Sequence, residues 1–237
     1  MSIGQSIRVE GVALTLGDHD FAFDLGIPAG SFAVITGPSG SGKSTLFNLI
    51  AGFEAPRSGR ILIGENDVTR LSPADRPVSL AFQDNNLFAH LDIFTNVALG
   101  ISPALRLDAD ARSRVSEALA RVGLGGFEKR LPGNLSGGER QRAAFARAIV
   151  RHRPVMLLDE PFAALDPALR RDMGDLLLSL HADEGFTVLM ITHDPQEAER
   201  LADMAVFVDR GRVAAIAPSA DFFTRSKPAA LAEFLRS

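Results

Sequence analysis

The chain has 237 residues, of which 46% are hydrophobic and 23% charged, and its formal net charge is −4. It is long enough to bury a sizeable core, and because it has no cysteine, disulfides and Cys-ligated metals are excluded. Its basic residues are scattered, which does not favour nucleic-acid binding, and without a signal peptide or membrane-spanning apolar run we expect a soluble, cytoplasmic chain.

Strand and helix patterns alternate in the first part of the chain. Residues 21–27, FAFDLGI, place apolar side chains at every second position, the pattern of a half-buried strand. Residues 31–36, SFAVIT, form a short apolar run, typical of a strand buried on both faces. Residues 44–53, STLFNLIAGF, predict a helix that ends at Gly52. Residues 59–67, GRILIGEND, predict another strand that runs into a turn.

The middle of the chain, residues 84–151, is predicted to form a helical lobe, after a further strand pattern in VSLAFQ. Asp108 can cap a helix that stops at Gly123. A second helix follows the motif LSGGERQR and ends before Pro154. The first helix carries one apolar stripe, made of Ala111, Val115, Ala118, Leu119 and Val122.

Buried strands return after this lobe. Residues 155–160, VMLLDE, and 186–193, FTVLMITH, are apolar runs that end in polar residues, and AVFVDRGRVAAI predicts a hairpin. Because strands and helices alternate, we predict an α/β fold with a mostly parallel sheet and helices on both faces. Its core comprises residues 1–83 and 152–237, in a single domain of residues 1–237 that includes the lobe.

A glycine-rich loop, GPSGSGKST, lies between a predicted strand and a predicted helix. Its spacing, G-x-x-x-x-G-K-[ST], lets backbone N–H groups surround phosphate oxygens at the positive end of the helix. We expect Lys43 to reach the β- and γ-phosphates and the hydroxyl of Ser44 to bind Mg²⁺. The alternative, a chance Gly/Ser-rich turn, does not account for the flanking strand and helix. The predicted phosphate site comprises Gly37, Pro38, Ser39, Gly40, Ser41, Gly42, Lys43, Ser44 and Thr45.

Two carboxylates close the strand pattern VMLLDE. Asp159 is expected to help bind Mg²⁺, and Glu160 to act as general base for the water that attacks the γ-phosphate. Without the phosphate loop, this pair would be an ordinary solvated loop start. His193 and Gln83 also end strand patterns, and each by itself is as compatible with a structural role as with a γ-phosphate contact.

Together these motifs resemble the ATP-binding subunit of an ATP-binding cassette (ABC) transporter over nearly the whole chain. GPSGSGKST resembles the Walker A loop, Gln83 the Q-loop glutamine, LSGGERQR the signature, VMLLDEP the Walker B strand, Ala164–Asp166 the D-loop and His193 the switch histidine. The resemblance implies a P-loop NTPase core with a mostly parallel sheet, an antiparallel β subdomain and an inserted helical subdomain. It implies ATP and Mg²⁺ as ligands, catalytic roles for Glu160, His193 and Gln83, and Mg²⁺ binding by Ser44, Gln83 and Asp159.

The resemblance also implies that two copies of the chain pair head to tail. ATP would lie between the Walker A loop of one copy and the signature of the other, where Ser136, Gly137 and Gly138 contact the γ-phosphate and Asp166 borders the nucleotide. Ser136 and Glu139 have the S-x-x-E spacing of a capping box, which fixes a helix start whose dipole favours an anion. An ordinary capping box accounts for these two residues but not for the glycine pair.

The segment FQDNNLFAHLDIFTNVALG resembles the ATPase subunit of bacterial thiamine and thiamine phosphate importers. The alternative is an importer of another small solute, such as iron(III), a polyamine, molybdate or sulfate. Either importer implies a membrane permease, a periplasmic substrate-binding protein and a peripheral position on the cytoplasmic face of the inner membrane. The permease would dock on Leu87, Phe88, Leu91 and Phe94, and packing within the lobe is the alternative for each.

One departure from the family concerns the adenine, which is usually stacked on an aromatic residue upstream of Walker A. This chain has no Tyr and no Trp, Leu16 falls at that place, and Phe21 and Phe23 are predicted to face the core. We therefore expect aliphatic contact from Leu16 in place of stacking, which leaves the preference for ATP over GTP open.

Two other classes of protein are weaker alternatives. A soluble ABC-type ATPase of DNA repair or translation would carry a long coiled-coil insertion or a second cassette, which this sequence lacks. A module that binds nucleotide without hydrolysing it would not need Glu160 and His193.

Overall fold

The computed structural model describes residues 4–82 and 86–224, together with residues 231 and 233. The chain forms two compact units. The first unit contains the residues up to Val78, Pro154–Pro161 and the residues from Leu180 onward. The second contains Ser79–Arg153 and Phe162–Ser179, and residues 86–151 of the predicted helical lobe fall within it.

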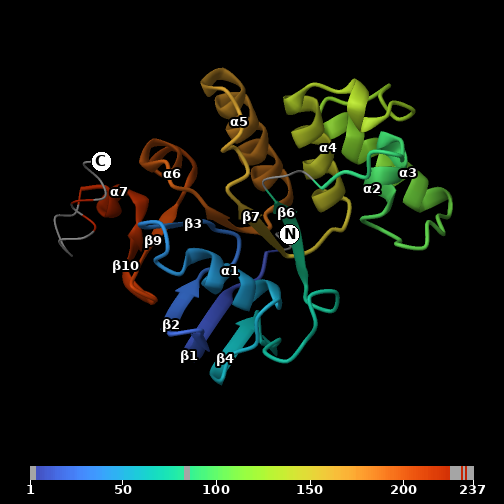
Figure 1. The fold of residues 1–237 in the computed structure, drawn as a ribbon. Helices are drawn as coiled ribbons and strands as arrows, with labels where there is room; N and C mark the ends of the chain where they lie inside the picture. The colour runs from blue at the N-terminus through green and yellow to red at the C-terminus, as the bar shows by residue number, and fades with distance from the viewer. Residues whose placement is uncertain (1–3, 83–85, 225–230, 232, 234–237) are drawn as a thin grey trace. The chain divides into compact units, whose positions relative to one another are not determined.

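The first unit is built around a mixed sheet (Figure 1). Its described strands are hydrogen-bonded in the order β5-β4-β1-β2-β10-β9-β3-β8-β7. The β3–β8, β3–β9 and β7–β8 pairs are parallel, whereas β1–β2, β1–β4, β4–β5 and β9–β10 are antiparallel. The prediction of an α/β fold is thus confirmed. The elements are β1 (Ile7–Leu16), β2 (His19–Ile27), β3 (Phe32–Thr36), α1 (Lys43–Ala51), β4 (Ser58–Ile63), β5 (Asn66–Asp67), β7 (Val155–Asp159), β8 (Thr187–Ile191), α6 (Pro195–Leu201), β9 (Met204–Asp209), β10 (Arg212–Pro218) and α7 (Ser219–Phe222).

The apolar runs of the sequence form the parallel strands. Every residue of β3 and of β8 is buried, as are the first four residues of β7. Strands of this kind are covered on both faces, which explains why their sequences do not alternate. In Figure 1, α1 lies between β3 and the antiparallel group of β1, β2 and β4.

The second unit begins within β6 (Val78–Phe82), and its other described elements are helices joined by loops. Asp108 caps α3, its Oδ1 accepting a 2.8 Å hydrogen bond from the N–H of Ala111, and the predicted apolar stripe of this helix is buried. A short helix that was not predicted begins at Ile93, where Asp92 serves as its cap. The elements are α2 (Ile93–Ala98), α3 (Ala109–Arg121), the 3₁₀ turn η1 (Pro132–Asn134), α4 (Gly137–Ile149) and the first part of α5 (Pro167–Glu184), which ends in the first unit.

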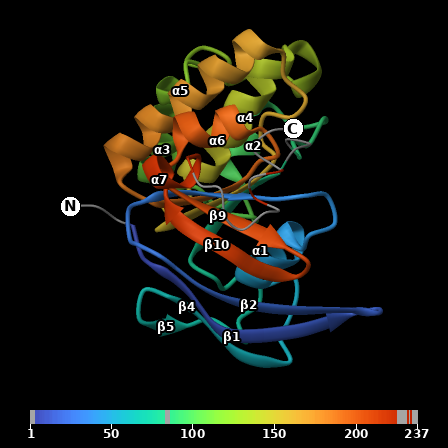
Figure 2. The same ribbon diagram turned by 90° about the vertical axis from the view of Figure 1, so that its left-hand side faces the viewer.

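The predicted hairpin is formed by β9 and β10, which lie side by side in Figure 2. Its two turn residues, Arg210 and Gly211, both have positive φ, as a tight type I′ turn requires. The N–H of Gly211 donates a 2.8 Å hydrogen bond to the carbonyl of Ser41, and its carbonyl accepts one of 2.9 Å from Ala22. The turn of the hairpin is therefore hydrogen-bonded to the glycine-rich loop.

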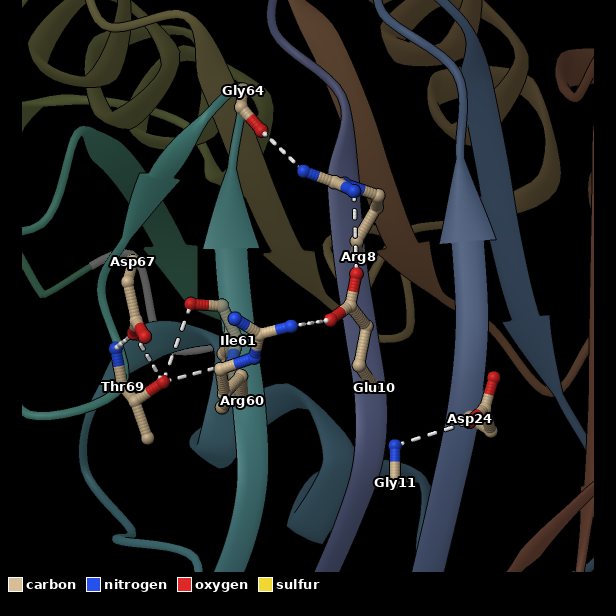
Figure 3. A network of polar contacts seen from close by, with 9 residues as sticks. All are labelled: Arg8, Glu10, Gly11, Asp24, Arg60, Ile61, Gly64, Asp67 and Thr69. Atoms are coloured by element: carbon tan, nitrogen blue, oxygen red, sulfur yellow. Dashed lines mark hydrogen bonds and ion pairs between the residues drawn. The ribbon is translucent and has the colours of Figure 1, made fainter.

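A network of polar contacts joins β1 to β4 in the antiparallel part of the sheet (Figure 3). Glu10 accepts hydrogen bonds from Arg60 at 2.8 Å and from Arg8 at 3.3 Å. Beside it, the N–H of Gly11 donates to Asp24, at a bulge that shifts the register between β1 and β2. Both arginines are exposed and Glu10 is only half-buried, so these ion pairs stabilise the fold only weakly.

Candidate nucleotide site

The glycine-rich loop joins β3 to α1, and its backbone adopts conformations that favour glycine. Gly37 has a φ of 144°, and a Cβ atom there would lie 2.1 Å from the carbonyl oxygen of Val208. Gly42 has a φ of 107°, and its Cβ would lie 2.9 Å from Cε1 of Phe21. Gly40 has a φ of 74° but nothing lies within 4 Å of its Cβ position. Gly37 and Gly42 are therefore required for both space and conformation, and Gly40 for conformation alone.

Helix α1 begins without a side-chain cap. Its first hydrogen bond runs from the N–H of Leu46 to the carbonyl of Gly42. Within the described part of the chain, the preceding N–H groups of Lys43, Ser44 and Thr45 donate to no protein acceptor. Free N–H groups at the positive end of a helix favour a bound anion.

Lys43 is the buried cation of this loop. Its Nζ donates hydrogen bonds of 2.8 Å to the carbonyl oxygens of Gly37 and Pro38. Burial lowers the pKa of this ammonium group, and the negative charges of Glu160 and Asp159 act in the opposite direction. Because both acceptors are neutral carbonyls, the ammonium can exchange them for phosphate oxygens, which are stronger acceptors.

The predicted carboxylates lie where β7 ends. Burial raises the pKa of Asp159, and so does the charge of Glu160, while Lys43 acts to lower it. Glu160 has a φ of 44°, which is uncommon in a residue other than glycine. Its N–H donates a 3.1 Å hydrogen bond to the carbonyl of Ile191 on β8, which fixes this strained conformation. Backbone strain of this kind concentrates at functional sites.

His193 follows β8, and its Nδ1 lies 3.3 Å from Oε2 of Glu160. The imidazole is 60% exposed, so its own packing does little to fix it. The first unit thus brings four of the predicted site residues together: Lys43, Asp159, Glu160 and His193.

The residues on either side of His193 are held by the start of α6. Thr192 is buried and donates a short hydrogen bond from Oγ1 to Oε2 of Glu197, which is also buried. The same Oγ1 accepts a 3.1 Å hydrogen bond from the N–H of Asp194, and Asp194 caps α6. These supporting residues were not predicted, although the D-P-x-E spacing of residues 194–197 is typical of a helix start.

The signature motif begins α4 in the second unit. The predicted capping box is present: Oγ of Ser136 accepts from the N–H of Glu139 at 3.3 Å, and Oε2 of Glu139 accepts from the N–H of Ser136 at 2.7 Å. These bonds lower the pKa of Glu139. The backbone of Gly137 is open to one side, because nothing lies within 4 Å of its Cβ position.

The predicted docking residues lie on a loop and on the helix that follows it. The side chain of Asn96, which is fully buried, is hydrogen-bonded to the backbone of this loop. Its Oδ1 accepts from the N–H of Phe88 at 2.7 Å, and its Nδ2 donates to the carbonyls of Phe88, Leu91 and Asp92 at 3.1, 2.9 and 3.0 Å. Phe88 itself is 48% exposed. Leu87, Leu91 and Phe94 are half-buried, so part of each side chain packs within the unit.

Gln83 and Leu16 were also predicted to contact the nucleotide or its cation. Gln83 lies outside the described residues. Leu16 is half-buried at the end of β1, where it pairs with His19. Of the two phenylalanines expected to face the core, Phe23 is buried, whereas Phe21 is half-buried and borders Gly42 of the phosphate loop.

The donors and acceptors of the first unit fit a nucleoside triphosphate with a divalent cation. The free N–H groups and Lys43 suit phosphate oxygens, while the exposed hydroxyl of Ser44 and the carboxylate of Asp159 are hard oxygen ligands. No cluster of three or more His, Cys, Asp or Glu side chains that could hold a metal ion occurs among the described residues. A cation would therefore depend on phosphate oxygens as well as on these two side chains.

Comparison with known proteins finds relatives that match almost the whole chain. A sequence profile of the ABC transporter family matches residues 22–163. The chain is 56% identical, over 230 residues and 97% of each protein, to the "Thiamine import ATP-binding protein ThiQ" of Rhizobium meliloti (strain 1021). It is 50% identical, over 223 residues, to the protein of the same name from Cereibacter sphaeroides, covering 94% of this chain and 96% of that one.

Solved structures show the same fold. The ATP-binding cassette MJ1267, in its ADP conformation, superposes with a TM-score of 0.88 at 23% identity, covering 97% of this chain and 98% of that one. The ATP-binding cassette MJ0796, a dimer in a post-hydrolysis state bound to ADP and Pi, has a TM-score of 0.75 at 30% identity, covering 90% and 98%.

Proposed function

Since the chain belongs to the ABC transporter family, we propose that it is the ATP-hydrolysing subunit of a thiamine importer. The observation that carries this proposal is its identity of 50–56% with thiamine import ATP-binding proteins over almost their whole length. The site of the first unit supports the ATPase part, because it combines a phosphate loop with two carboxylates and a histidine.

The chain's own groups account for binding and hydrolysis of ATP. The free N–H groups at the start of α1 and the ammonium of Lys43 bind the β- and γ-phosphates. Glu160 accepts a proton from the attacking water, and His193 orients the Glu160 carboxylate through their 3.3 Å contact. Ser44, Asp159 and Gln83 would hold Mg²⁺, which when bound would stabilise the negative charge of the phosphoryl group.

A second copy of the chain completes the site in this proposal. Ser136, Gly137 and Gly138 of one copy approach the nucleotide held by Lys43 of the other, and Asp166 borders it. The open backbone at Gly137 and the helix start fixed by the capping box support this arrangement. The dimeric state of the related cassette MJ0796 supports it too.

We place the subunit at the cytoplasmic face of the inner membrane, bound to a permease that works with a periplasmic substrate-binding protein. No helix in the described part of the chain is long and apolar enough to cross a membrane. The exposed ring of Phe88, on the loop that Asn96 holds, supports docking through Leu87, Phe88, Leu91 and Phe94.

Leu16 contacts the adenine, and comparison of ATP and GTP turnover tests whether this aliphatic contact discriminates between the bases.

Uptake of labelled thiamine tests the cargo. Cells lacking this subunit should lose uptake and regain it with the wild-type chain, but not with Glu160→Gln. If uptake is unimpaired without the subunit, thiamine is not the cargo, and uptake of iron(III), polyamines, molybdate and sulfate should be measured in the same cells.

Gel filtration tests the dimer. Glu160→Gln should form an ATP-dependent dimer, and a Glu160→Gln variant that stays monomeric and keeps full turnover would contradict the ATPase assignment.

A further inference from the structure

The sheet of the first unit gives the phosphate loop two different sides. Glu160 follows β7 and His193 follows β8, and both strands lie on one side of β3 in the sheet order. On the other side of β3 the order runs through β9 and β10 to β2 and β1. Since the γ-phosphate must face Glu160 and His193, a nucleotide held at the start of α1 directs its nucleoside away from them, toward the side of β2.

Phe21 on β2 borders the phosphate loop on that side. Its ring carbons Cε1 and Cδ1 lie 2.9 and 3.0 Å from the position of a Cβ atom at Gly42, and Cδ1 lies 3.2 Å from that of Gly211. The edge of the Phe21 ring is therefore in contact with the backbone of both glycines. The side chain is only half-buried, so part of the ring is open to a ligand.

The Phe21 ring is held in place by its neighbours. It stacks on the ring of Phe23, which is buried, with centroids 6.1 Å apart and an angle of 27° between the planes. The N–H of Ala22 donates a 2.9 Å hydrogen bond to the carbonyl of Gly211, and the N–H of Gly211 donates one of 2.8 Å to the carbonyl of Ser41. β2 is thus tied to the phosphate loop. A ring fixed in this way loses little conformational entropy when a ligand packs against it.

Leu16 lies on the same face of the β1–β2 pair as Phe21. Leu16 pairs with His19, and Leu14 pairs with Phe21. Paired residues share a face, as do residues two apart on one strand, so Leu16 and Phe21 are diagonal neighbours. Both are half-buried, whereas Leu14 is buried and His19 is exposed. Leu16 and Phe21 together form an apolar surface beside the phosphate loop.

The other phenylalanines on the elements next to the loop are closed to a ligand. The chain has no Tyr and no Trp, so a large aromatic contact to the base has to come from a phenylalanine. Phe32 on β3, Phe47 on α1 and Phe207 on β9 are each at most 1% exposed. Phe21 differs from these three in that its ring is partly open and lies beside Gly42.

We infer that Phe21 and Leu16 form the apolar wall against which the adenosine of ATP packs, and that Phe21 supplies the larger part of this contact. An aromatic ring packs against the face of a base whatever hydrogen-bonding groups the edges of that base carry. The contact therefore strengthens binding of the nucleoside without distinguishing adenine from guanine. The inference rests on the proposed function, in which the phosphate loop binds ATP.

Binding of ATP and of inorganic tripolyphosphate, each with Mg²⁺, to the isolated subunit tests the inference. Tripolyphosphate has the phosphate chain of ATP but no nucleoside. Phe21→Ala should weaken ATP binding at least about fivefold, as expected for the loss of one base–aromatic contact. GTP binding should fall by the same factor to within about twofold, because both bases present a ring face. The affinity for tripolyphosphate should stay within about twofold of wild type, because its charge-assisted hydrogen bonds are unchanged.

Three further variants complete the comparison. Phe21→Leu keeps apolar bulk beside Gly42 but has no ring, so its ATP affinity should lie between those of wild type and Phe21→Ala, and it carries the test if Phe21→Ala does not fold. Leu16→Ala should weaken ATP binding less than Phe21→Ala does. Phe53 is 50% exposed and lies beyond the end of α1 that is opposite to the phosphate loop, so Phe53→Ala is the matched control and should bind ATP like wild type.

Unchanged ATP binding in Phe21→Ala and Phe21→Leu would overturn the inference and leave the proposed function standing. An equal loss of affinity for ATP and tripolyphosphate would also overturn it, because Phe21 would then only support the loop. A loss for ATP but not for GTP would contradict packing against the ring face. If the wild-type chain binds neither ATP nor tripolyphosphate, the proposed function itself fails, and the inference fails with it.

Discussion

Nδ1 of His193 lies 3.3 Å from Oε2 of Glu160, at the ends of two adjacent parallel strands. The contact joins a half-buried carboxylate to an imidazole that is mostly exposed. Because few other contacts restrain the imidazole, the backbone on either side must position it.

His193→Ala should therefore lower kcat by at least about tenfold, with the affinity for ATP within about twofold of wild type, because the phosphate loop does not depend on it. Steady-state ATPase kinetics and equilibrium nucleotide binding check this. Glu160→Gln, as the comparison, should lose about 10²–10⁴-fold. Full turnover by His193→Ala would show that Glu160 is oriented without it.

Thr192→Val should lower kcat by about tenfold, since the Thr192 hydroxyl bonds both Glu197 and the N–H of Asp194 beside His193. Thr192→Ser keeps the hydroxyl and is the matched control, with activity near wild type. A merely structural loss would lower the melting temperature of Thr192→Val and leave the kcat of its folded fraction unchanged, which would contradict a positioning role.

Gly37→Ala and Gly40→Ala should behave differently although both glycines have positive φ. Gly37→Ala places a Cβ 2.1 Å from the carbonyl oxygen of Val208, so the loop must move and ATP binding should be lost. Gly40→Ala meets no atom and incurs only backbone strain of about 1–2 kcal/mol. Its melting temperature should fall by roughly 2–8 °C. Thermal unfolding and ATP titration separate the two, and equal losses of binding would contradict the steric account.

Arg76→Met should destabilise the first unit. The Arg76 guanidinium is buried and donates to the carbonyls of Leu49 at 2.5 Å and Ile50 at 2.8 Å, at the end of α1, and to Leu71 and Thr69 at 3.2 Å. Its loss leaves buried carbonyls without donors, which costs about 3 kcal/mol or more and lowers the melting temperature by about 6–12 °C.

The contribution of Arg76 to the melting temperature should not change with pH near neutrality. Burial lowers the pKa of Arg76 to about 10, below that of the unfolded chain, so the unfolded state binds more protons only above about pH 10. The difference in melting temperature between wild type and Arg76→Met should therefore be constant from about pH 6 to 9. A marked change within that range would contradict this account.

Asn96→Asp should disrupt the docking loop. It replaces an amide donor that bonds the carbonyls of Phe88, Leu91 and Asp92 with an acceptor, so the carbonyls lose their partner. Co-purification with the permease should fall to about the level of Phe88→Ala, while ATPase activity of the isolated subunit stays within about threefold. Normal assembly would show that the loop shape is not what the permease recognises.

The sequence by itself determined many of the strands and helices and the residue types that gather at the site. Continuous apolar runs gave β3, β7 and β8, because strands covered on both faces need no polar positions. The spacing of residues 37–45 gave the phosphate loop, and capping residues such as Asp108 and Ser136 gave the helix starts. These are local properties, and adjacent residues decide them.

Only the tertiary structure decided which distant residues meet. The contact of Glu160 with His193 and the hydrogen bonds of Arg76 to the end of α1 join segments far apart in the sequence. The surroundings of Gly137 and Gly138 are a further case: both lie at the start of α4, but a Cβ atom would meet nothing within 4 Å at Gly137 and would lie 2.7 Å from Cδ1 of Leu169, on α5, at Gly138. Space at a position depends on what packs against it, and no pattern within the helix itself records that.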